Sequence, residues 1–178
     1  MKNLKDLISL AWWLIACLLC FSATEGNAQV IKMSAKDLTK NSTAVLYGKC
    51  SKVKSEWNDK KNMILTSVTI VPDEYIKGNL GSEAVITVPG GRVDNILYEV
   101  SDMPLFIEGE DVVAFVSTNS KGKNLVTGGY QGKIKIEKDK KTGKKMVEDT
   151  GDEIHAPGQV KRTTLEDYVE KLKSWAEN

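Results

Sequence analysis

The chain has 178 residues, a length typical of one domain, and it carries 25 Lys and Arg against 24 Asp and Glu. Because the formal net charge is only +1, no overall field draws the protein to nucleic acid or to an anionic membrane surface, and neither is an expected partner. About 150 residues remain after the N-terminal segment, enough to bury a core without disulfides or a structural metal.

The N-terminal segment has the pattern of a secretory signal peptide. Lysines precede an apolar run over residues 7–23, and the small residue Ala28 stands where a signal peptidase would cut before Gln29. We therefore predict a signal peptide, with a signal-peptide helix, over 1–28. The remaining single domain, 29–178, is predicted to be exported and to be periplasmic or extracellular.

The same segment allows two alternatives. The apolar run 7–23 is close to the lower length limit of a spanning helix, about 17 residues, so an uncleaved membrane anchor is one of them. The sequence LIAC at 14–17 resembles the lipobox of bacterial lipoproteins, so lipidation at Cys17 is the other. Apolar residues follow Cys17, whereas a polar tether normally follows a lipidated cysteine.

The first half of the domain predicts a short helix and a hairpin. Ser34 is a candidate N-cap for a helix over 34–40. Alternating apolar residues predict strands over 43–57 and 64–70 that pair across a polar turn, and Gly48 suggests a bulge or a tight bend.

Further strands are predicted along the rest of the chain, over residues 84–88, 111–116, 125–127 and 133–136. The continuous apolar run 111–116 predicts a strand buried on both faces, with Val113 and Phe115 among the most buried side chains. Residues 92–106 are compatible with either a strand or a helical turn.

A helix is predicted at the C-terminus, over about 164–176. Thr163 and Glu166 stand at capping-box spacing. The apolar residues follow a 3.6-residue period that defines one face, and they are Leu165, Tyr168, Val169, Leu172 and Trp175.

These elements predict a mainly β fold, a small OB-like β-barrel of five to six strands with a C-terminal α-helix. The barrel core is placed over about 43–137 and a hairpin extension over about 133–149.

Several strand ends carry a recurrent pattern, which includes VLYGKC at 45–50, YIKG at 75–78, VPGG at 88–91 and the Gly109-Glu110 pair before VVAFV. This pattern resembles uncharacterised exported bacterial proteins. It is also similar to netrin-like domains, which are OB-type barrels that include the tissue inhibitors of metalloproteinases. The resemblance implies a barrel that binds a partner.

In those inhibitors the amino group and carbonyl of an N-terminal cysteine chelate the catalytic zinc of the protease. Cleavage before Gln29 would leave Gln29 at the N-terminus here, and the paired cysteines of that family are missing. The resemblance therefore does not carry that inhibitory mechanism to this chain.

The residues offer little for catalysis. His155 is the only histidine, and Asp152 and Glu153 beside it are too few ligands for a metal site. Cys50 is the only cysteine of the mature domain and is expected to be a small buried apolar residue. We predict no catalytic, cofactor-binding or metal-binding residues and no cofactor; a Cys50–His155 dyad is the alternative.

One strong local charge feature is a run of lysines, which we call the lysine cluster: Lys133, Lys135, Lys138, Lys140, Lys141, Lys144 and Lys145. It is expected to be a solvated hairpin face, because charged residues protect exposed strand edges. The functional alternative is a docking surface for an anionic polysaccharide. Aromatic residues do not interleave the lysines, which argues against single-stranded nucleic acid.

The sequence therefore predicts an exported, non-catalytic binding or inhibitory module whose partner is an unknown protein or an anionic polysaccharide. Two alternatives remain: a small enzyme with an unrecognised site that uses Cys50 or His155, and a membrane-anchored envelope protein.

Overall fold

The computed structural model describes residues 32–149 and 161–177. The predicted leader, with residues 7–23 and Cys17, and the segment that contains His155 lie outside the described residues. By its internal contacts Lys32–Asn178 forms a unit separate from Met1–Ile31, and all the described residues belong to it.

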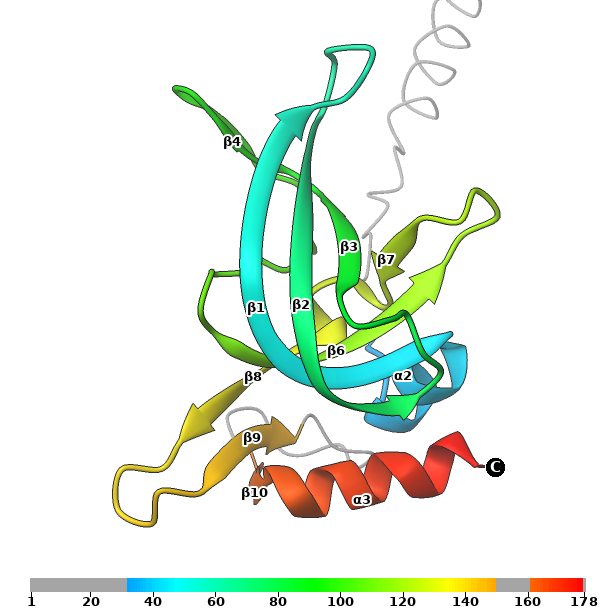
Figure 1. Cartoon of the computed structure of the whole chain (residues 1–178), viewed down its shortest axis with the longest axis vertical. Helices are drawn as coiled ribbons and strands as arrows, with labels where there is room; N and C mark the ends of the chain where they lie inside the picture. Colours follow the sequence, from blue (N-terminus) through cyan, green and yellow to red (C-terminus); the bar gives the residue numbers. More distant parts are fainter. Residues whose placement is uncertain (1–31, 150–160, 178) are drawn as a thin grey trace, which may run out of the picture. The chain divides into compact units, whose positions relative to one another are not determined.

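Five strands close into a small barrel (Figure 1). Their order is β1-β2-β3-β7-β6, and β6 returns to pair with β1. The strands are β1 (Ala44–Trp57), β2 (Ile64–Lys77), β3 (Ala84–Pro89), β6 (Asp111–Thr118) and β7 (Asn124–Val126). All pairings are antiparallel except that of β3 with β7, which is parallel. The predicted OB-like barrel is confirmed.

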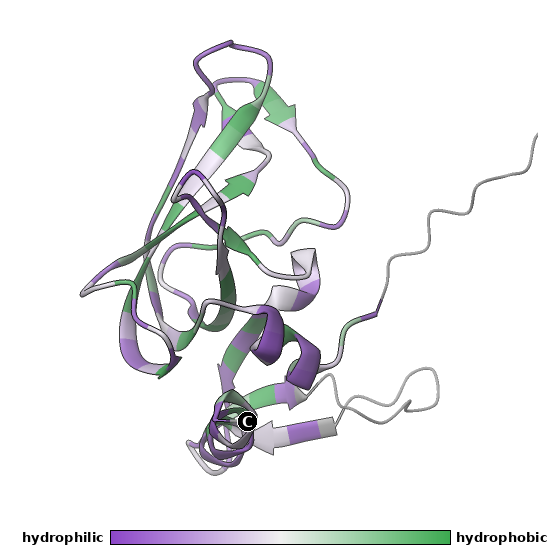
Figure 2. Ribbon diagram, turned by 90° about the vertical axis from the view of Figure 1, so that its right-hand side faces the viewer, coloured by the Kyte–Doolittle hydropathy of each residue, from purple (hydrophilic) through white to green (hydrophobic). Residues whose placement is uncertain are grey.

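Three more strands extend the sheet from β6, and two helices lie beside it. The strands are β8 (Lys133–Lys138), β9 (Lys145–Asp149) and β10 (Lys161–Thr164), and the helices are α2 (Ala35–Asn41) and α3 (Leu165–Ala176). A short 3-10 helix, η1 (Gly129–Gly132), joins β7 to β8. Figure 2 shows apolar residues along the barrel strands and hydrophilic residues at the loop tips.

The first strand is long and strongly bent (Figure 1). Gly48 lies at a shift in the β1–β2 register, and a Cβ at this position would collide with the carbonyl oxygen of Val71. Gly48 is therefore the predicted bend, because only glycine permits this close approach of two backbones. The bend lets the first half of β1 pair with β6, while its second half extends past the barrel with β2.

Alternate residues of β6 contribute to two separate cores. Val112, Ala114 and Val116 point into the barrel with Leu46, Ile70 and other apolar residues of β1 to β3. Val113 and Phe115 point outward, into a second layer that α2 and α3 cover. All five β6 side chains are completely buried, so the prediction of a strand buried on both faces is confirmed.

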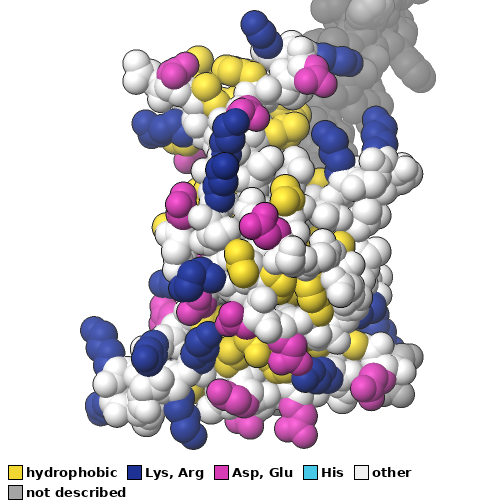
Figure 3. Space-filling view, in the orientation of Figure 1, with side chains coloured by type: hydrophobic (Ala, Val, Ile, Leu, Met, Phe, Trp, Pro, Cys, Tyr) yellow, Lys and Arg dark blue, Asp and Glu magenta, His cyan; other side chains and the backbone are white. Residues whose placement is uncertain are grey.

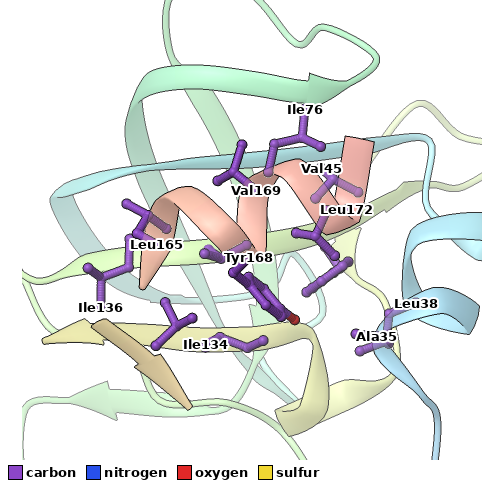
Figure 4. Packing of buried hydrophobic residues seen from close by; sticks show 13 residues of the cluster. Ala35, Leu38, Val45, Ile76, Ile134, Ile136, Leu165, Tyr168, Val169 and Leu172 are labelled. Carbon is purple, nitrogen blue, oxygen red and sulfur yellow. The ribbon is translucent and has the colours of Figure 1, made fainter. Parts of the chain in front are cut away.

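The C-terminal helix lies across the barrel. Its stripe of Leu165, Tyr168, Val169 and Leu172 is buried, with Trp175 at the margin. Figure 4 shows Tyr168 in the middle of this layer, between α3 and Ile134 of β8. Lys173 of α3 forms an ion pair with Glu74 of β2, and this partner lowers the pKa of the Glu74 carboxyl.

The predicted cap of this helix is wrong by one residue. Thr164, and not Thr163, is the N-cap, and its hydroxyl accepts a hydrogen bond from the Asp167 amide. Both threonines belong to β10, where Thr163 pairs with Val147 and Thr164 with Met146. The N-cap is the last extended residue before the helix, and that residue is Thr164, with which the strand ends.

The ambiguous segment 92–106 is partly strand. A two-stranded hairpin forms from β4 (Gly91–Val93) and β5 (Ile96–Tyr98), and it pairs with no other strand of the described part. Residues 99–110, which we call the strap, then lead without regular structure to β6. Helices long and apolar enough to cross a membrane are not found among the described residues.

Candidate functional site

A groove of about 750 Å³ opens at the end of the barrel where β1 and β2 extend beyond β6. One wall is the inner face of the first three strands, with Val53, Ser55, Thr66, Val68 and Val88. The other wall is formed by the end of the β4–β5 hairpin and by the strap, with Leu97, Tyr98, Val100, Met103, Leu105 and Phe106. Its volume is within the range of small-ligand sites, about 300–1,000 Å³, and barrel mouths are a common place for them.

The two hydroxyl groups on the strand wall of the groove, those of Ser55 and Thr66, already have partners. Ser55 Oγ and Thr66 Oγ1 lie 2.8 Å apart, and Thr66 donates to the carbonyl oxygen of Gly90 at 2.6 Å. Arg92 and Glu99 stand at the mouth, where neither forms an ion pair within the part of the chain that the structure describes. The walls are therefore mainly apolar, with one charge of each sign at the entrance.

Large apolar side chains on the outer wall are exposed to solvent. Leu97 is 52% exposed and Leu105 is 76% exposed, and both line the groove. Exposed aliphatic side chains beside an apolar groove are typical of binding surfaces, because their burial by a ligand is favourable. Across the face seen in Figure 3, by contrast, charges of both signs are interspersed with smaller apolar areas.

The strap is held in place by Lys133. Its Nζ lies 2.6 Å from Glu110 Oε1, donates to the carbonyl oxygen of Leu105 at 2.6 Å, and lies 5.0 Å from the centre of the Phe106 ring. Glu110 Oε1 also accepts a hydrogen bond from the Ile107 amide at 2.7 Å. The side chains of Lys133 and Glu110 are only 12% and 7% exposed. This nearly buried ion pair holds the strap, and with it the outer wall of the groove, in place.

We expect Lys133→Met to destabilise the protein by about 2–3 kcal/mol, because it leaves the Glu110 carboxylate buried without its cation. Amide hydrogen exchange should accelerate in the strap, including at Ile107, while the amides of the barrel strands still exchange slowly. The matched control is Lys135→Met on the same strand, since the Lys135 side chain is 60% exposed and its ammonium pairs with the similarly exposed Glu137. Equal effects of the two variants would contradict this role of Lys133.

The other members of the lysine cluster lie in different surroundings. Lys135 pairs with Glu137, and Lys145 lies 3.3 Å from Asp73. The remaining lysines make no ion pair among the described residues and surround the tip of the β8–β9 hairpin: Lys138, Lys140, Lys141 and Lys144. Basic side chains gather over this hairpin in Figure 3. The tip, rather than the whole cluster, is the candidate surface for an anionic partner.

The tip carries one carboxylate, which the turn itself uses. Asp139 accepts hydrogen bonds from the amides of Lys141 and Thr142, and those from Thr142 lower the pKa of its carboxyl. Gly143 at this tip adopts the left-handed conformation that favours glycine, with a φ of 70°.

Cys50 points into the barrel core and is completely buried. Burial raises the pKa of its thiol, and the nearby Glu110 carboxylate raises that pKa further. Both effects disfavour the thiolate that a nucleophilic cysteine needs. His155, Asp152 and Glu153 lie outside the described residues, so the alternative dyad is not tested.

Within residues 32–149 and 161–177, no three His, Cys, Asp or Glu side chains gather in a way that could hold a metal ion. Comparison with known proteins finds no family model that matches the chain and no significant match to a curated protein. The groove and the residues around it are therefore the features that bear on function.

The groove was not predicted from the sequence, although two local signals point to it. The Pro89-Gly90-Gly91 segment ends β3 and redirects the chain across the barrel mouth. The following segment, 92–106, contains the apolar pairs Ile96-Leu97 and Leu105-Phe106, but it lacks the long apolar periodicity of the core strands.

Proposed function

We propose that this chain is an exported, non-catalytic binding module and that the groove at the barrel mouth is its ligand site. The observation that carries the proposal is the combination of an apolar groove with the exposed Leu97 and Leu105 on its rim. Burial of such side chains by a ligand would supply about 25 cal/mol for each Å² of apolar surface removed from water. Export is inferred from the leader sequence alone.

A binding role is favoured over catalysis by the chemistry of the groove. The hydroxyl groups of Ser55 and Thr66 are engaged with each other and with the Gly90 carbonyl, and burial raises the pKa of the Cys50 thiol, which disfavours the reactive thiolate. The enzyme alternative would then depend on His155. The membrane-anchored alternative concerns only the leader and is compatible with the same ligand site.

The proposal is tested with an apolar fluorescent probe, anilinonaphthalene sulfonate, whose emission increases in apolar surroundings. We expect the native domain to bind the probe, and Leu105→Asp to weaken binding about tenfold or more, since burying a leucine is worth about 1.5–3 kcal/mol. Leu105 is highly exposed, so the variant should fold normally.

The matched control is Ile107→Asp. Ile107 belongs to the same strap and is 59% exposed, but it does not line the groove. It should bind the probe like the parent protein, as should a variant with Cys50→Ala and His155→Ala. Equal loss of binding in Leu105→Asp and Ile107→Asp would show that the probe binds elsewhere.

A further inference from the structure

The second half of β1 has one paired edge and one open edge. Residues 45–49 pair with β2 on one side and β6 on the other, whereas residues 52–57 pair only with β2 among the described strands. The ladder with β6 ends at Cys50, whose amide donates to the Glu110 carbonyl at 2.8 Å and whose carbonyl accepts from the Gly109 amide at 2.7 Å. Gly109 has a φ of 89°, and there the chain turns away from β1 into the strap.

The hydrogen-bond pattern shows which backbone groups face this open edge. The amide of Asn58 donates to the Met63 carbonyl at 2.8 Å, so this pair is hydrogen-bonded. In an antiparallel ladder hydrogen-bonded and non-hydrogen-bonded pairs alternate, so Lys54 and Glu56 also direct their backbone groups toward β2. The amides and carbonyls of Val53, Ser55 and Trp57 therefore point away from β2, to the open edge.

The same alternation connects the open edge to the groove. Val53 and Ser55 direct their side chains to the inner face of the sheet, where they line the groove. Trp57, 37% exposed, continues that face. A strand added along the edge would thus place every second side chain beside these residues, toward the exposed Leu97 and Leu105.

We propose that the groove and the open edge of β1 together form a site for an extended polypeptide of a partner protein, which adds to the sheet as an antiparallel strand. This inference rests on the proposed function and names the class of ligand. Strand addition supplies affinity through backbone hydrogen bonds, while pockets for alternate side chains supply specificity.

Charges on the outer face define the partner further. Lys52 and Lys54 lie on this face, and Lys54 forms an ion pair with Glu56. Lys52 makes no ion pair within the described part of the chain. Opposite charges directly across two strands are stabilising. The partner segment therefore has apolar residues that face the groove and an acidic residue opposite Lys52.

The test uses a short synthetic peptide in which valine alternates with threonine and glutamate, together with two N-methylated analogues. In the added strand the valines lie opposite Val53, Ser55 and Trp57, with their side chains toward the groove and their amides toward β1. The amides of the threonines and glutamates point away from β1. We expect methylation of the valine amides to weaken binding at least tenfold, and methylation of the polar residues to leave it within about twofold. Equal effects of the two analogues would overturn the proposal.

Amide hydrogen exchange gives a second measurement. The unmodified peptide should slow exchange at Val53, Ser55 and Trp57 more than at Lys54 and Glu56, which already bond to β2. Protection of the first three amides without peptide, increasing with protein concentration, would overturn the proposal by showing that a second copy occupies the edge.

A charge exchange tests the register. Lys52→Glu should weaken binding of the glutamate-containing peptide and strengthen binding of an analogue in which lysine replaces glutamate. Unchanged affinity for both peptides would contradict the assigned partner chemistry.

The two proposals fail separately. If the fluorescent probe binds the groove as expected but no peptide does, strand addition is wrong and the apolar ligand site stands. If the peptide binds with the expected methylation pattern while Leu105→Asp leaves probe binding unchanged, strand addition stands and the probe site is wrong.

Discussion

Replacing Phe115 with Ala is expected to lower the free energy of unfolding by about 3–5 kcal/mol. The Phe115 ring is completely buried in the layer between the barrel and the helices, where it packs with Leu38 and Tyr168. Removal of the ring leaves a cavity in a closely packed layer. Because helices lie on one side of this layer and strands on the other, the surrounding side chains cannot close the cavity. Urea-induced unfolding followed by tryptophan fluorescence measures the change.

The matched control is Val85→Ala. Val85 belongs to another barrel strand, β3, but is 47% exposed, so the expected loss is below about 1 kcal/mol. A loss below about 1 kcal/mol for Phe115→Ala as well would mean that this layer does not stabilise the barrel.

Deletion of residues 165–178 should have a still larger effect, because it removes one side of the same layer. The truncated protein would expose the outward faces of β1 and β6, including Val45, Val113 and Phe115. A helix of this length is marginal on its own in water, so helix and barrel depend on each other for stability. We expect aggregation, or loss of a cooperative thermal transition measured by circular dichroism.

A point variant tests the same contact without truncation. Leu172→Asp places a charge at a completely buried position of α3 and should lower the melting temperature strongly. Glu170→Ala, at an exposed position of the same helix, should leave it nearly unchanged. If the truncated protein melts like the parent, α3 is not part of the folding unit.

The two layers explain why the groove can remain open. The outer layer of α2, α3 and the β8–β9 extension buries most of the large side chains on one side of the barrel. The strap is held separately, by Lys133 and by the Asp102 carbonyl, which accepts a hydrogen bond from the Tyr130 amide at 2.7 Å. The apolar wall of the groove is thus fixed without needing to collapse onto the opposite wall.

Local patterns in the sequence predicted the regular elements well. The strands of the first hairpin and the C-terminal helix have clear periodicities, and the structure confirms them, with the second strand continuing to Lys77 beyond its predicted end. The run 111–116 was recognised instead by its continuous apolar character, and it too is a strand. Periodicity works there because side chains alternate every second residue in a strand and return every 3.6 residues in a helix, whatever the rest of the chain does. The bend at Gly48 was also predictable locally, because a glycine within a strand pattern indicates a bulge or a close backbone approach.

Contacts between distant parts of the chain decided the rest. Lys133 was grouped with its neighbouring lysines, but its role depends on Glu110 and Leu105, which only the fold brings to it. The open edge of β1 exists because the chain turns at Gly109, and the groove exists because segment 97–106 crosses the barrel mouth. A sequence pattern shows which side of an element is apolar, but not which other element covers that side or leaves it open, because that depends on how the barrel closes.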